Sequence, residues 1–440
     1  TVRGKETKRC TDCHVSETKD NNAWMATVLL QGTNFVNLLG RYAWVATGEG
    51  GFEAITVAER EEPPAMLGSH LHKLAFPANF DTFVKGGREL HEVDHHPGNA
   101  LDIQVRGEYA YVALGPGGFR VYDVASIANK SVSQRIITAP FSALGHDTHI
   151  PSSNATCMAL PTNQPVAPFK NKGDLIRKTN QEQPFHPIYN YAFITDAKEG
   201  LILTDVNTLQ DGEPRNNFLT RALTWNENGV LDGARHITMG GYYAYIVADA
   251  GLVILNLNDP LKPVVTKVLP LKNARASALQ FRYLTVIDNT GLRVVDITIP
   301  ERAKVVEGAH IPLKDAHRVY IARTYAYVAA GPEGLVIVDI ENPEKPKVYQ
   351  KLTADGTLND ARDVVVATTN ASLLGYVADG RNGLKVLQLT SPEIQPKFYG
   401  FTPEPKPVVI ATRKTQSPAI SLSRGLERDR GVDETGGQVA

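Results

Sequence analysis

A short pattern of aromatic, small and branched apolar residues repeats along the chain. The copies are YAWVA from Tyr42, YAYVA from Tyr109, YAFIT from Tyr191, YAYIV from Tyr243, YLTVI from Tyr283, YAYVA from Tyr325 and LGYVA from Leu374. A glycine begins a second apolar segment eight or nine residues after each start. These segments are GFEAITV from Gly51, GFRVYDV from Gly118, GLILTDV from Gly200, GLVILNL from Gly251, GLRVVDI from Gly291, GLVIVDI from Gly334 and GLKVLQL from Gly383. The pattern predicts seven antiparallel β-hairpins with glycine-containing turns.

A further strand is predicted on each side of the hairpins. DAHRVYIAR at Asp315–Arg323 precedes one hairpin, and the prolines of NPEKPKVYQKL at Asn342–Leu352 delimit a fourth, outermost strand after it. Four short strands in each unit of about 40 to 50 residues are typical of a β-propeller blade. A linear β-solenoid is the alternative, but the hairpins are too numerous for one coil per repeat. The sequence therefore predicts an all-β fold, a seven-bladed β-propeller.

Two long insertions interrupt the repeat. The starts at Tyr42, Tyr109 and Tyr191 are 67 and 82 residues apart, whereas the later starts follow one another at intervals of 40 to 52 residues. The excess falls at residues 59–98 and 130–189, and function is often located in such excursions from a regular scaffold. We expect residues 36–410 to form the propeller, residues 1–35 a separate N-terminal segment, and residues 411–440 a polar tail that packs as a short helix or a contact arm.

Composition excludes several classes of protein. The chain has 440 residues, 42% of them hydrophobic, which is enough for a large core. The 46 Lys and Arg residues against 47 Asp and Glu leave a formal charge of −1, so nucleic acid is a disfavoured partner. No apolar run is long enough to predict a transmembrane segment. The motifs of serine hydrolases, P-loop proteins and dinucleotide-binding proteins are absent from the sequence.

Two of the three cysteines are closely spaced in RCTDCH, where Cys10 and Cys13 are followed directly by His14. C-x-x-C-H is the spacing of covalent haem attachment, in which two thiols form thioethers and the adjacent imidazole ligates the iron. Zinc would require a second pair of ligands with similar spacing, and a redox dithiol would require a βαβ context. We therefore predict one covalent haem c, with thioethers from Cys10 and Cys13 and His14 as the proximal iron ligand. KDNNAWMATVLLQG, which follows, predicts a short helix.

The propeller segments resemble a known family. GLVIVDIENPEKP, GLRVVDITIPERA and GLVILNLNDPLKP are similar to the LVIVD-repeat β-propellers of bacteria and archaea, over roughly Val36 to Phe401. Some members of that family join the propeller to c-type haem motifs on its N-terminal side, and RCTDCH followed by DNNAWM resembles such a multihaem-type cytochrome. The resemblance implies the propeller fold and a fused haem segment, but the family as a whole has no agreed activity.

A second histidine could complete the coordination of the iron. Five histidines lie in the first insertion, in HLH and HEVDHH. We predict His95 or His96 as the distal ligand, with His91, His72 and His70 as lower-ranked candidates. Iron with two histidine ligands is coordinatively saturated and suited to electron transfer. The alternative is that HEVDHH binds a separate divalent ion through His91, Asp94 and His95.

Other histidines, methionines and the third cysteine are candidates of lower rank. His146 and His149 in GHDTH have a spacing that could serve a metal or the haem, although surface histidines often have no such role. His236 and His317 begin innermost strands, so we expect them to be hydrogen-bonded residues of the central channel. Methionine ligation of the haem is the less favoured possibility, and Cys157 is expected to be a lone buried thiol.

Together these features predict a c-type cytochrome subunit for extracytoplasmic electron transfer, with the propeller as a rigid scaffold and a partner-binding surface. Covalent haem attachment implies a periplasmic or extracellular location. The chain begins with Thr1, which fits removal of a targeting segment or a longer parent polypeptide. Expected partners are other haem-bearing chains or a missing N-terminal multihaem segment, within a larger complex. Two alternatives remain: an adhesion or scaffold propeller with an accessory haem, and a haem- or metal-dependent small-molecule oxidoreductase.

Overall fold

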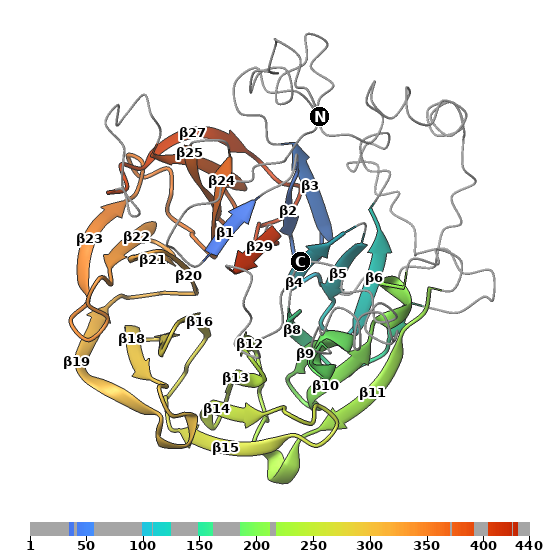
Figure 1. The fold of residues 1–440 in the computed structure, drawn as a ribbon. Coiled ribbons are helices and arrows are strands. Elements are labelled where there is room, and N and C mark those ends of the chain that lie inside the picture. Colours follow the sequence, from blue (N-terminus) through green and yellow to red (C-terminus); the bar gives the residue numbers. More distant parts are fainter. Residues whose placement is uncertain are drawn as a thin grey trace, which may run out of the picture.

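Seven antiparallel sheets surround a central axis as the blades of a propeller (Figure 1). The structure, a computed structural model, describes residues 35–38, 42–56, 99–107, 109–124, 148–161, 185–211, 217–369, 372–390, 404–424 and 426–429. Each pentapeptide identified in the sequence lies in the second strand of a blade, and each glycine-led segment forms the third. The prediction of an all-β, seven-bladed propeller is confirmed.

The strands of each blade follow one another from the innermost outward. Blade one contains β28 (Ser421–Leu422), β2 (Tyr42–Ala46) and β3 (Phe52–Thr56). Blade two contains β4 (Asp102–Arg106), β5 (Tyr109–Ala113), β6 (Phe119–Asp123) and β7 (His149–Ile150). Blade three contains β8 (Ala155–Ala159), β9 (Tyr191–Asp196), β10 (Gly200–Asp205) and β11 (Thr220–Trp225).

The remaining four blades each have four consecutive strands. Blade four contains β12 (His236–Gly240), β13 (Tyr243–Ala248), β14 (Gly251–Asn256) and β15 (Val264–Leu269). Blade five contains β16 (Ala276–Gln280), β17 (Tyr283–Asp288), β18 (Gly291–Asp296) and β19 (Lys304–Pro312). Blade six contains β20 (Arg318–Ala322), β21 (Tyr325–Ala329), β22 (Leu335–Asp339) and β23 (Lys347–Leu352). Blade seven contains β24 (Asp363–Thr369), β25 (Ser372–Ala378), β26 (Leu384–Thr390) and β27 (Val408–Arg413).

Short 3-10 helices connect several of these strands. They are Pro187–Asn190, Asn207–Leu209, Glu227–Gly229 and Pro300–Arg302. The described residues include no helix that is long and apolar enough to cross a membrane.

The ring is closed by the C-terminal part of the chain. β28 provides the innermost strand of blade one, with Ser421 paired to Ala46 and Leu422 paired to Val45. β1 (Phe35–Leu38) does not join blade one but pairs with β29 (Leu426–Asp429). Figure 1 shows this two-stranded sheet on the inner side of blade seven, where β1 contacts β24.

The structure therefore differs from the expected polar tail at residues 411–440. β27 continues to Arg413, and residues 419–423 bond to blades seven and one. The amide of Ile420 donates to the carbonyl of Ala46 at 2.9 Å, and the amide of Ser423 donates to the carbonyl of Trp44 at 2.8 Å. The physical reason is that the inner edge of β2 presents unpaired backbone groups, which a strand from the far end of the chain satisfies.

The second insertion also contains propeller strands. β7 and β8 lie within residues 130–189, as the outer strand of blade two and the inner strand of blade three. Neither strand carries the repeated pentapeptide or the glycine-led segment, so neither stands out in the sequence among the surrounding polar residues. The other residues of this insertion, and residues 57–98 of the first, lie almost entirely outside the described part of the chain.

The repeated glycine before the third strand has a steric cause in every blade except blade one, where a Cβ at Gly51 would meet no described atom within 4 Å. Gly334 has a φ of +72°, and a Cβ atom there would overlap the carbonyl oxygen of Leu352 on the outermost strand. Because only glycine combines a positive φ with this close approach, the turn requires it. The core lies between adjacent blades: Val294 of blade five and Val336 of blade six are both fully buried in one cluster. The seven innermost strands contact one another in sequence around the channel.

Candidate functional site

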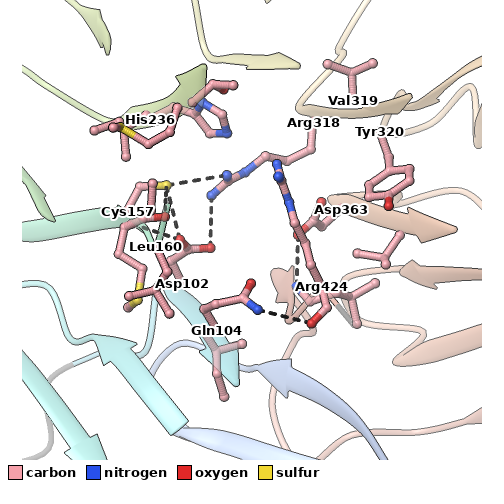
Figure 2. Close-up of a pocket in the computed structure, with 18 of the residues that line it drawn as sticks. Asp102, Gln104, Cys157, Leu160, His236, Arg318, Val319, Tyr320, Asp363 and Arg424 are labelled. Carbon is pink, nitrogen blue, oxygen red and sulfur yellow. Dashed lines mark hydrogen bonds and ion pairs between the residues drawn. The ribbon is translucent and has the colours of Figure 1, made fainter. Parts of the chain in front are cut away.

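One residue from each innermost strand lies at the same register around the central channel. In every blade it pairs with the fifth residue of the repeated pentapeptide. These seven residues, here called the channel ring, are Asp102, Cys157, His236, Ala276, Arg318, Asp363 and Ser421. All except Ala276 are polar or ionisable, so the propeller gathers groups from six blades at one level of its channel. Figure 2 shows several of them in the channel.

Asp102 is the most connected member of the channel ring. Its Oδ1 accepts a 2.7 Å hydrogen bond from the Ser421 hydroxyl. Its Oδ2 accepts hydrogen bonds from the Met158 amide at 3.0 Å and the Cys157 thiol at 3.1 Å. The carboxylate also faces Arg318, whose Nη2 lies 3.6 Å from Oδ1. One side chain thus connects blades one, two, three and six.

Asp363 is the second carboxylate of the channel ring. The amides of Leu422 and Val364 donate to it at 2.9 and 2.8 Å, and the Ser421 hydroxyl lies 3.2 Å from Oδ2. Burial raises the pKa of Asp363, and the charge of Asp102 adds to this, while Arg318 and the two amides oppose it. A protonated Asp363 can donate to the Ser421 oxygen when the Ser421 proton is directed at Asp102.

Arg318 lies between the two carboxylates. Its Nη1 donates a 3.7 Å hydrogen bond to the sulfur of Cys157, in addition to the 3.6 Å ion pair with Asp102. Burial opposes the ionised form of Arg318, but Cys157, Asp102 and Asp363 outweigh it and raise the pKa above its ordinary value. Arg318 therefore provides a permanent positive charge inside the channel.

His236 is a neutral residue of the channel ring. It is 3% exposed, and the amide of Ser277 donates to its Nδ1 at 3.3 Å. Burial, together with the charges of Arg318 and Arg424, holds its pKa well below the ordinary value. The hydrogen bond from Ser277 assigns the proton of the neutral ring to Nε2, which makes that nitrogen a donor.

Cys157 is a buried, protonated thiol. Burial, followed by the negative charge of Asp102, raises its pKa to about 12. A thiol in this state is a poor nucleophile and a poor metal ligand, because both roles need the thiolate. The expectation of a lone buried thiol is confirmed.

The channel ring borders a cavity of about 120 Å³. Its walls come from the innermost strands of every blade except blade five, and Arg424, two residues after the end of β28, also lines it. The guanidinium carbon of Arg424 lies 6.0 Å from the centroid of the Tyr320 ring. The cavity is thus a polar space lined by two arginines, one neutral imidazole and two carboxyl groups.

Both histidines that were expected to be channel residues are hydrogen-bonded, and His236 lies in the channel. His236 belongs to the channel ring, and His317 precedes β20, with Nε2 at 3.0 Å from Asp315 and 3.1 Å from Arg362. Met158, considered as a haem ligand, is buried in the core between blades two and three. His149 lies in β7 with Nε2 at 2.8 Å from the carbonyl of Gly117, so this imidazole has a structural partner.

The predicted haem residues and most predicted iron ligands fall on the part of the chain that the structure does not describe. They are Cys10, Cys13, His14, His70, His72, His91, His95, His96 and His146. Within the described ranges, no group of three or more His, Cys, Asp or Glu side chains could hold a metal ion.

Sequence reasoning missed most of the channel ring. Asp102, Arg318, Asp363 and Ser421 belong to no recognisable motif, and Ser421 comes from the supposed tail. A signal did exist: in blades two, four, six and seven a polar residue begins the strand that pairs with the pentapeptide. Aligning those strands by register would have placed these residues in the channel.

Comparison with known proteins supports the fold. Three stretches match the LVIVD repeat, at residues 97–134, 233–267 and 314–352. They cover most of blades two and four and all of blade six. The chain is therefore a seven-bladed β-propeller, and it contains LVIVD repeats. No curated protein matches the sequence.

Solved propellers are similar in fold at low sequence identity. A candidate 6-phosphogluconolactonase from Bacteroides fragilis has a TM-score of 0.52 at 9% identity, over 87% of this chain and 98% of that one. The Cps50 (Swd1) β-propeller domain of Myceliophteria thermophila has a TM-score of 0.46 at 11% identity, over 76% and 95% of the two chains. The computationally designed Ika8 protein has a TM-score of 0.45 at 11% identity, over 90% and 97%. Similarity at this level concerns the fold alone.

Proposed function

We infer that the chain is a c-type cytochrome subunit in which one haem is held beside a seven-bladed propeller. The observation behind this proposal is the motif R-C-T-D-C-H, with Cys10, Cys13 and His14 in the spacing of covalent haem attachment. The bound haem would supply one-electron redox chemistry. The propeller would be a rigid scaffold and a surface for partners, which we propose are other haem-bearing chains in a larger complex.

The donor set of the motif fits a haem. Each thiol would add across one vinyl group, forming a sulfur–carbon bond while its hydrogen passes to the other vinyl carbon. His14, adjacent in sequence, would give its neutral imidazole to the iron. No oxidant is required for either addition. Because this attachment takes place outside the cytoplasm, the proposal includes a periplasmic or extracellular location.

The environment of Cys157 supports the assignment of Cys10 and Cys13 to haem attachment. Cys157 is 2% exposed, and its thiol donates to Asp102 within the channel ring. It is thus unsuited to complete a zinc site or to exchange with Cys10 or Cys13. The two cysteines of the motif are then the chain's only candidates for thiol chemistry.

The connections of blade one support a distal ligand from the first insertion. Residues 57–98, which contain His70, His72, His91, His95 and His96, connect β3 of blade one to blade two. The N-terminal segment leads into β1, which contacts β24 of the neighbouring blade seven and is separated from β2 by residues 39–41 alone. In the chain, the haem motif and the histidine-rich insertion thus lie on either side of the β2–β3 hairpin of blade one. We propose His95 or His96 as the distal iron ligand, which would leave no open position on the iron.

Counting free cysteines in the purified 440-residue chain tests the proposal. The chain is unfolded, reduced, alkylated and weighed, so that every cysteine not bound to haem is labelled. The proposal predicts a single label, on Cys157, together with a covalently retained haem. Labelling of all three cysteines without retained haem would contradict it.

Two variants make the assignment specific. Replacing both Cys10 and Cys13 by Ser should abolish haem retention. The control, Cys157→Ser, keeps a donor for Asp102 and should retain the haem while no cysteine is labelled. Retention of covalent haem by the double variant would mean that the motif is not the attachment site.

A further inference from the structure

The channel cavity contains donor groups that the protein itself does not satisfy. A guanidinium group has five N–H donors. In Arg318, the described residues provide only the Cys157 sulfur at 3.7 Å and an oxygen of Asp102 at 3.6 Å. That carboxylate already accepts three shorter hydrogen bonds, from Ser421, Met158 and Cys157. Arg318 also keeps 20% of its side-chain surface accessible, although it lies within the ring of strands.

His236 presents a second donor in the same space. With Nδ1 accepting from Ser277, its Nε2 carries the proton, and the described residues place no acceptor on that nitrogen. The residue is 3% exposed and lines the cavity. This N–H group borders the cavity, where a bound acceptor could take its hydrogen bond.

Arg424 brings a second positive charge to the cavity. Arg318 and Arg424 are both near enough to His236 to disfavour its protonation. Figure 2 shows Arg318 and Arg424 in the channel, where Arg318 comes from β20 and Arg424 from the residues that follow β28. Two guanidinium groups that line one cavity repel each other, and an anion between them would relieve this repulsion.

The other groups of the channel ring do not provide the negative charge that an anion would bring between the two arginines. Asp102 and Asp363 lie in the wall and are occupied by hydroxyl, thiol and amide donors. Cys157 is a neutral thiol, and β16 contributes Ala276 to the channel ring. These acceptors are thus occupied in the wall, while donor groups of Arg318 and His236 remain toward the cavity.

We propose that the channel cavity is a binding site for a short-chain monocarboxylate, held by Arg318, Arg424 and the Nε2–H of His236. A planar guanidinium fork matches the two oxygens of a carboxylate. The cavity of about 120 Å³ limits the occupant to a few heavy atoms, because a water molecule occupies about 30 Å³ and a cavity of about 150 Å³ admits benzene. This site is independent of the proposed haem.

Calorimetric titration of the full chain with sodium acetate tests the proposal, at neutral pH and at an ionic strength kept constant with sodium chloride. Acetamide, which has nearly the same shape but no charge, is the matched control ligand. The proposal predicts saturable binding of acetate and none of acetamide. Equal heats for the two ligands, or no saturable binding of acetate, would overturn it.

Variants locate the bound acetate. Arg424→Gln removes one charge without breaking the contact of Arg318 with Asp102, and should weaken acetate binding by about tenfold or more, as expected for loss of a charge-assisted hydrogen bond. Arg413→Gln, on the exposed outer strand of blade seven, makes the same charge change away from the channel and should bind as the unaltered chain does. Equal affinity of the two variants would overturn the site. His236→Gln gives a second test, and circular dichroism verifies that each variant is folded.

Discussion

The Ser421 hydroxyl lies 2.7 Å from Oδ1 of Asp102, although the two residues are 319 positions apart in the chain. This hydrogen bond connects β28, the innermost strand of blade one and the last innermost strand in the chain, to β4, the innermost strand of blade two. The same hydroxyl lies 3.2 Å from Asp363 of blade seven. Ser421 thus links the blades on both sides of the point where the ring closes.

Substitution of Ser421 by Ala should weaken this closure. The change leaves a buried carboxylate oxygen without its shortest partner, and we expect the free energy of unfolding to fall by about 1.5 to 3 kcal/mol. Urea denaturation followed by circular dichroism measures it. Ser417→Ala is the control, since the described residues show no hydrogen bond from that side chain. Equal effects of the two substitutions would contradict the role of Ser421.

Asp363 should make the stability of the propeller depend on pH. Burial raises its pKa above the ordinary value of 3.8, so the folded chain keeps a proton that the unfolded chain has released. The folded state binds more protons in this window, and the contribution to stability is therefore lost as the pH rises from 3.8 through the folded-state pKa.

Asp363→Asn tests this contribution because it removes the titrating group. Relative to the unaltered chain, the variant should become more stable between about pH 4 and pH 7, as measured by urea denaturation at each pH. Asp355→Asn, at an exposed position after β23, is the control that makes the same charge change away from the channel. A constant difference between the Asp363 variant and the unaltered chain would contradict the account.

The repeated glycine should be needed for close approach as well as for its backbone angle. Gly334 and Gly308 both have positive φ values, of +72° and +78°, but only a Cβ at Gly334 meets neighbouring atoms. Gly308→Ala should cost about 1 to 2 kcal/mol from backbone strain. Gly334→Ala should lower the free energy of unfolding by clearly more than Gly308→Ala does, as measured by urea denaturation. Equal losses would mean that overlap with Leu352 is unimportant.

Loss of the distal ligand should open the iron. If His95 or His96 provides it, His95→Ala or His96→Ala should give a high-spin visible spectrum and bind carbon monoxide in the reduced state. His310→Ala is the control, because that histidine lies in the outer strand of blade five, 3.2 Å from the hydroxyl of Thr290. If both insertion variants keep the original spectrum, the ligand lies elsewhere.

The strands of the propeller could be predicted from the sequence because their signal is local. Tyr325 and Gly334 begin segments whose alternation and turn residue are visible within 15 residues, and the same spacing recurs seven times. Ring closure is not local. Ser421 pairs with Ala46 across almost the whole chain, and its two-residue strand has no periodicity to detect.

The sequence could place some residues near the channel, but not the contacts between blades that form the channel ring. His236 and His317 could be assigned to the channel region because each adjoins the start of an innermost strand. Cys157 was recognised as buried, but its place in the ring depends on a bulge that shifts the pairing of β8 with β9. The contact of Arg318 with Asp102 requires the curvature of the whole ring, which no single repeat encodes.

The central proposal, a saturated c-type haem beside the propeller, is tested most directly by visible spectroscopy. A reduced-minus-oxidised spectrum of the purified 440-residue chain is recorded with and without carbon monoxide. The account predicts a c-type haem spectrum that carbon monoxide does not change. The absence of haem absorbance would contradict the cytochrome assignment, and a spectrum altered by carbon monoxide would contradict the saturated iron on which electron transfer is proposed.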